Sequence, residues 1–142
     1  MKFMLDTNVF DRILGTPGMV SLLNTLSKAG AITLLTTPVQ EAELQAMPDA
    51  RRRRVAQSIL RQVVPADDGL DMAAPPGAVD PRTLMPSPKH LRDALIGAAA
   101  SWQVDVLVTE DRRFAKRVRE AHANCRVIGF AEFRSMVMAS DP

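Results

Sequence analysis

The chain has 142 residues, of which 46% are hydrophobic, and a formal net charge of +2. This length suits one domain with a real core, expected over residues 1–142, and no apolar run is long enough to span a bilayer. The single cysteine, Cys125, excludes an intrachain disulfide and a cysteine-built zinc site, and fits a reducing, cytoplasmic setting.

Short apolar runs alternate along the chain with longer amphipathic segments. The short runs are expected to be strands at residues 3–5, 32–35, 62–64, 105–108 and 126–128. The longer segments are expected to be helices at residues 19–29, 38–47, 49–61, 91–102, 112–121 and 131–138. This alternation predicts a three-layer α/β/α fold class, with a central parallel sheet and helices on both faces.

Residues 65–87 interrupt the alternation. The segment is rich in proline and also holds Gly69 and Gly77. We expect a long loop within the domain, and long loops in compact domains are commonly functional or mobile.

Two acids follow predicted strands directly. Asp6 comes after the first strand and Asp111 after the fourth. In an open parallel sheet, ligands bind outside the carboxyl ends of the strands, so both acids are candidates for a functional site. Taken singly, each is better explained as a helix cap, because aspartate is preferred just before a helix. Glu110, beside Asp111, remains an alternative to it.

Two further acids lie inside predicted helices that begin alike. Thr37 followed by Pro38, and Ser87 followed by Pro88, are each an N-cap followed by a proline at the first helical position. Glu43 lies as far past the first proline as Asp93 lies past the second.

Asp93 falls in an otherwise apolar stretch, where burying an unpaired carboxylate would be costly. Glu41 competes with Glu43, but it falls nearer the helix start, where an acid simply favours the positive helix end. We prefer Glu43 and leave Glu41 open.

If both helices start at the carboxyl edge of the sheet, Asp6, Glu43, Asp93 and Asp111 converge. Four carboxylates in one cleft repel one another unless cations lie between them. Ligation by oxygen alone suits Mg²⁺ or Mn²⁺. Such ions activate water and stabilise both oxygens of an in-line phosphodiester displacement.

Basic residues are clustered, most visibly at Arg51, Arg52, Arg53 and Arg54. Such a run commonly marks a solvated helix face, but beside an acidic, metal-binding cleft it also fits a polyanionic partner. We expect these four arginines, together with Arg112 and Arg113, to bind such a partner, which the resemblance described next implies to be RNA.

Four segments resemble the motifs of PIN-domain nucleases. They are residues 5–10 (Leu-Asp-Thr-Asn-Val-Phe), 37–44, 93–100 and 106–114. Each motif is weak alone, but their order and spacing, from Asp6 to Phe114, cover most of the chain.

This resemblance implies a PIN-like, Rossmann-like sheet and metal-dependent cleavage of RNA by Mg²⁺ or Mn²⁺. The implied acidic ligands are Asp6, Glu43, Asp93 and Asp111, and the implied polar neighbours are Thr7, Asn8 and Thr109. Many bacterial chains of this size resemble VapC-type toxins, each neutralised by a small antitoxin protein. The proline-rich segment at residues 65–87 departs from the pattern and leaves the substrate open.

Two other functions compete. In a phosphohydrolase with an aspartyl nucleophile, Asp6 would attack the phosphorus atom, but such enzymes usually carry a second aspartate two positions on, where this chain has Asn8. A PIN fold that binds RNA or protein without cutting is the other alternative. The sequence leaves open the RNA target, the antitoxin and the oligomeric state, a homodimer included.

Overall fold

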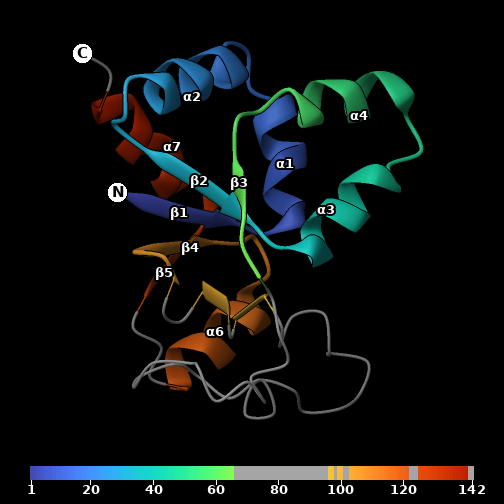
Figure 1. Ribbon diagram of the computed structural model, residues 1–142. Coiled ribbons are helices and arrows are strands. Elements are labelled where there is room, and N and C mark those ends of the chain that lie inside the picture. Colours follow the sequence, from blue (N-terminus) through green and yellow to red (C-terminus); the bar gives the residue numbers. More distant parts are fainter. Residues whose placement is uncertain (66–95, 98, 101–102, 122–124, 141–142) are drawn as a thin grey trace.

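The computed structural model describes residues 1–65, 96–97, 99–100, 103–121 and 125–140 (Figure 1). The predicted loop from residue 66 onward, and Asp93, lie outside these residues. Residues 96, 97, 99, 100 and 103 are helical, as the prediction of a helix at 91–102 requires of the first four. Within the described part of the chain, no helix is long and apolar enough to cross a membrane.

Five parallel strands form the central sheet, in the order β3-β2-β1-β4-β5. Their bounds are β1 (Lys2–Leu5), β2 (Thr33–Thr36), β3 (Gln62–Val63), β4 (Val106–Val108) and β5 (Arg126–Ile128). In the central strand β1, Phe3 pairs with Leu34 on one side and Val106 on the other. The sheet confirms the predicted fold class.

Helices cover both faces of the sheet (Figure 1). Their bounds are α1 (Thr7–Leu14), α2 (Met19–Lys28), α3 (Pro38–Gln45), α4 (Ala50–Gln57), α6 (Arg112–Glu120) and α7 (Phe130–Ala139). Helices α1, α2 and α7 share one apolar core with one face of the sheet. Helix α6 forms a second core on the opposite face together with Ile96, Ala99, Ala100 and Val104, and this core also buries Cys125.

The helix predictions need two corrections. Helix α1 was not predicted, although Val9, Phe10 and Ile13 form a buried face along it. The helix predicted at residues 49–61 ends at Gln57, because the chain turns there to bring Arg61 toward α3 and residues 62–63 into the sheet. The predicted stop at Gly30 is confirmed: this residue has φ of +77°, a backbone conformation that glycine adopts without steric cost.

Candidate functional site

The order of the strands creates a switch point between β1 and β4. The chain passes from β1 outward to β2 and β3, and then continues on the other side of β1 with β4 and β5. Ligands of open α/β sheets bind in the crevice at the carboxyl ends of the strands at such a point. Asp6 follows β1 and Thr109 follows β4, so both residues lie at this position.

Asp6 is buried, with 1% of its surface exposed, and both of its carboxylate oxygens accept hydrogen bonds. Oδ1 accepts from the backbone N–H of Thr7 at 2.7 Å, which makes Asp6 the N-cap of α1. Oδ2 accepts from the hydroxyl of Thr109 at 2.8 Å and from the amide of Asn8 at 3.3 Å. The capping interpretation is therefore confirmed, and the same contacts hold the carboxylate at the switch point.

Glu43 and Asp6 are connected by Thr7, which donates a hydrogen bond to each of them. Helix α3 begins as predicted, with Thr37 as N-cap and Pro38 at the first position, and the Gln40 side chain completes a capping box. This start directs Glu43 toward α1, where the Thr7 hydroxyl donates to Glu43 Oε1 at 2.8 Å. Thr7 thus contacts both acids, through its backbone N–H and its hydroxyl.

Glu41 has a different environment. Arg61 holds it in two hydrogen bonds, from Nε to Oε2 at 2.7 Å and from Nη2 to Oε1 at 2.8 Å, and the Thr36 hydroxyl donates to Oε2 at 2.5 Å. Arg61 Nη1 also donates to the carbonyls of Ala56, Gln57 and Ile59. Glu41 therefore ties α3 to the end of α4 and the start of β3.

The Glu41 pKa lies below its ordinary value of 4.5, because the Arg61 hydrogen bond outweighs partial burial, with help from Thr36 and from the Arg61 charge. A carboxylate with a lowered pKa stabilises the folded state above its unfolded-state pKa and loses that effect as the pH falls through the folded-state value. We expect wild type to be more stable than Glu41→Gln at neutral pH, and this difference to shrink below about pH 4.5. Urea unfolding of both proteins across this range measures it; a difference that stays constant into acid would contradict the assignment.

The side chains of Asp111 and Glu110 accept hydrogen bonds from the first residues of two different helices, α6 and α7. Asp111 is the N-cap of α6, and its Oδ1 accepts from the N–H groups of Arg113 and Phe114, each at 3.0 Å. Glu110 Oε1 accepts from the N–H of Phe130 at 2.6 Å, at the start of α7, and Arg12 lies 3.9 Å from its Oε2. Glu110 thereby joins α7 to the loop that follows β4.

Asp93 falls outside the described residues. Among those that the structure describes, no group of three or more His, Cys, Asp or Glu side chains could hold a metal ion. The donor chemistry nevertheless fits Mg²⁺ or Mn²⁺, because Asp6 and Glu43 are carboxylates joined through Thr7. A single site made of Asp6, Glu43, Asp93 and Asp111 stays a prediction.

The arginine run lies away from these acids. Arg52 pairs with Asp11 at 3.3 Å, and Arg53 donates to the carbonyl of Met47 at 2.8 Å. Helix α4 therefore contacts the later turns of α1 and the end of α3, whereas Asp6 and Thr37 cap the beginnings of those two helices. RNA binding by Arg51, Arg52, Arg53 and Arg54 stays a prediction.

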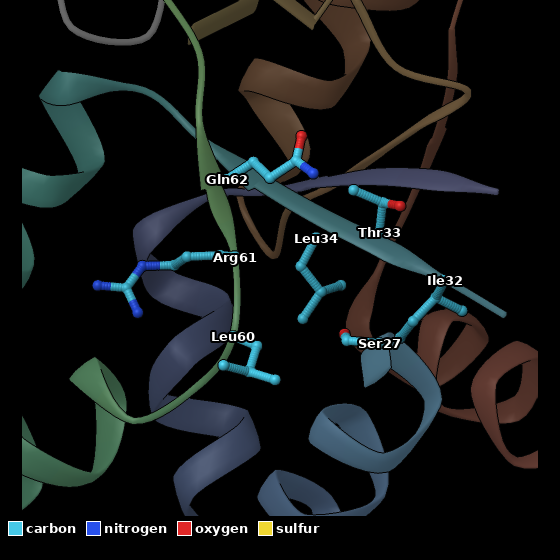
Figure 2. A pocket seen from close by; sticks show the side chains of 7 residues that line it. All are labelled: Ser27, Ile32, Thr33, Leu34, Leu60, Arg61 and Gln62. Atoms are coloured by element: carbon cyan, nitrogen blue, oxygen red, sulfur yellow. The ribbon is translucent and has the colours of Figure 1, made fainter. Parts of the chain in front are cut away.

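A hollow of about 230 Å³ lies elsewhere on the sheet (Figure 2). It lies between α2, β2 and the start of β3, and Leu34, Leu60 and Ile32 are among its lining residues. Of the candidate acids that the structure describes, none lines it, and the described lining does not include the residues of the switch point. Sequence reasoning missed Arg61, which borders this hollow and binds Glu41, because the two residues lie 20 positions apart.

No protein-family model matches the sequence, and no curated protein matches it. The fold is similar to that of a solved structure described as VapBC2 from Rickettsia felis bound to a DNA fragment from their promoter. The TM-score is 0.52 and the sequence identity 16%, and the match covers 91% of this chain and 98% of that one. At this identity the similarity establishes the fold alone, and it agrees with the three-layer α/β/α arrangement.

Proposed function

We propose that the chain is a metal-dependent endoribonuclease of the PIN type and the toxin of a toxin–antitoxin pair. The observation that carries the proposal is the series of contacts from Thr109 through Asp6 and Thr7 to Glu43, at the switch point of a parallel sheet. The motif resemblance and the similarity to the VapBC2 structure support it. A small antitoxin protein is the partner that this function requires.

In this proposal, Asp6, Glu43, Asp93 and Asp111 hold Mg²⁺ or Mn²⁺. The ion, when bound, supplies an activated water and stabilises charge on the phosphate. The residues of the chain orient the ligands: Thr109 and Asn8 fix one oxygen of Asp6, and Thr7 fixes Glu43.

Cleavage of single-stranded RNA by the purified chain tests the proposed chemistry. We expect Mg²⁺ or Mn²⁺ to support cleavage, a chelator to stop it, and fresh metal to restore it, because the bound ion would lower the pKa of water and stabilise charge on the phosphate. Gel analysis of a labelled RNA, with and without chelator, measures this. Tight RNA binding without metal-dependent cleavage would favour the non-cutting PIN fold instead.

Expression in bacteria tests the toxin assignment separately. An unrestrained nuclease depletes RNA, so the wild-type chain is expected to arrest growth, whereas Asp93→Asn is not. Growth curves after induction, with soluble protein quantified, measure the effect. Normal growth with abundant, soluble wild-type protein would contradict the toxin assignment. The remaining function would then be that of a PIN nuclease with a more specific RNA substrate.

A further inference from the structure

A second hollow, of about 430 Å³, adjoins the switch point. It lies between α6, α7 and the ends of β4 and β5. Its lining residues include Thr109, Glu110, Arg112, Arg119 and Phe130. It therefore combines two cations with an aromatic residue at the edge of the sheet where the acids lie.

This hollow, which we name the α6–α7 pocket, is continuous with the acidic site. Thr109 lines the pocket, and its hydroxyl donates to Asp6 at 2.8 Å. Glu110 also lines it, and its backbone N–H donates to Asn8 Oδ1 at 3.2 Å. A ligand in the pocket would therefore be separated from Asp6 by a single residue, Thr109.

The charges of the pocket favour an anion. Arg119 is exposed, and its Nη2 donates to the carbonyl of Val127 at 2.8 Å, which holds the guanidinium in place while other N–H groups remain. Arg112 is exposed at the first position of α6. The opposing acid, Glu110, accepts from Phe130 N–H, and the exposed Arg12 lies 3.9 Å from its Oε2.

We propose that the α6–α7 pocket binds a nucleotide of the RNA strand next to the phosphate that is cleaved, an inference that rests on the proposed function. Arg112 and Arg119 would bind its phosphate, because guanidinium groups match phosphate oxygens in geometry and charge. Phe130 is partly buried against the core and Phe133, and the rest of its ring would offer an aromatic surface of the kind on which bases of single strands stack. Helix α4 lacks this arrangement, because Arg52 and Arg53 are engaged at the far ends of α1 and α3.

Binding of a short, labelled, single-stranded RNA of mixed sequence tests the pocket, with a chelator present so that the RNA stays intact. Arg112→Gln is the primary variant, and Arg112→Gln with Arg119→Gln is the stronger one. Lys2→Gln with Lys28→Gln is the matched control, because it removes the same charge as the double variant at the opposite, amino-terminal edge of the sheet. Fluorescence anisotropy at several salt concentrations gives the dissociation constants.

We expect Arg112→Gln to weaken binding about fivefold, the double variant about tenfold or more, and the lysine control less than twofold. The slope of log affinity against log salt should become shallower by about 0.7 for each phosphate that the variant no longer neutralises. Affinities equal to wild type, an equal loss in the control, or no RNA binding by wild type would each overturn the proposal. The same variants can be tested for binding to poly-aspartate. If they lose as much affinity for poly-aspartate as for RNA, the proposal is overturned, because the pocket would then fit an acidic protein partner. If the double variant fails to fold, the RNA affinity of Arg112→Gln alone tests the proposal.

Cleavage separates the two proposals. If wild type cuts RNA and Asp6→Asn does not, while Arg112→Gln binds as wild type, the pocket alone is wrong. If Asp6→Asn cuts as well as wild type, the proposed function fails whatever the pocket variants bind.

Discussion

Replacing Asp6 by asparagine is expected to lower RNA cleavage by more than about a hundredfold, because residues that only orient metal ligands already cost up to about that factor. The fold should survive. Asparagine is also a good N-cap, so its amide oxygen can accept from the Thr7 N–H, and the Thr109 hydroxyl can turn to accept from the amide nitrogen. Cleavage rates with Mg²⁺ and thermal unfolding of both proteins measure the two effects.

Asp11→Asn is the matched control for this variant. Asp11 lies on the helix that Asp6 caps, its replacement makes the same change in charge, and it is an exposed partner of Arg52 rather than part of the switch point. Its cleavage rate should equal that of wild type. Wild-type turnover in Asp6→Asn would refute the four-acid site, and an equal loss in Asp11→Asn would point to a general effect of charge.

Glu43→Gln and Glu41→Gln are expected to have opposite effects on activity and stability. Glu43→Gln should reduce cleavage more than about a hundredfold with little loss of stability, because it removes a proposed metal ligand whose Thr7 contact an amide oxygen can still accept. Glu41→Gln should destabilise the fold by about 2 kcal/mol, because it weakens two charge-assisted hydrogen bonds from a side chain, Arg61, that is 11% exposed. Its cleavage rate should stay within a few-fold of wild type.

Measuring cleavage and urea unfolding for both variants tests this pair of expectations. The two glutamates lie two positions apart on one short helix, so each variant is the control for the other. The reverse ranking in cleavage would make Glu41 the ligand and Glu43 the structural residue.

Local signals in the sequence were sufficient to locate most elements of the fold. Thr37 and Pro38 predict the start of α3 because capping and proline geometry depend only on neighbouring residues. The same reasoning identified Asp6 and Asp111 as caps that follow strands. The alternation of apolar runs then predicted the parallel sheet.

Contacts between distant segments could not be predicted. The sequence contains two equivalent-looking acids in α3, and they are distinguished by the approach of Arg61 to Glu41 and of Thr7 to Glu43. The turn of the chain after Gln57, which brings Arg61 to Glu41, also makes α4 shorter than the helix predicted at residues 49–61. Likewise, neighbouring residues do not reveal that Glu110 faces α7, because its partner Phe130 lies 20 positions later.

The two outer strands of the sheet are short, since β3 has two residues and β5 has three. A strand at the edge of a sheet carries unpaired backbone groups with which another chain can pair, and short edges offer few of them. Val63, on β3, is 53% exposed, so a longer strand there would present an apolar template. The brevity of β3 thus leaves few backbone groups on this edge with which another chain could pair.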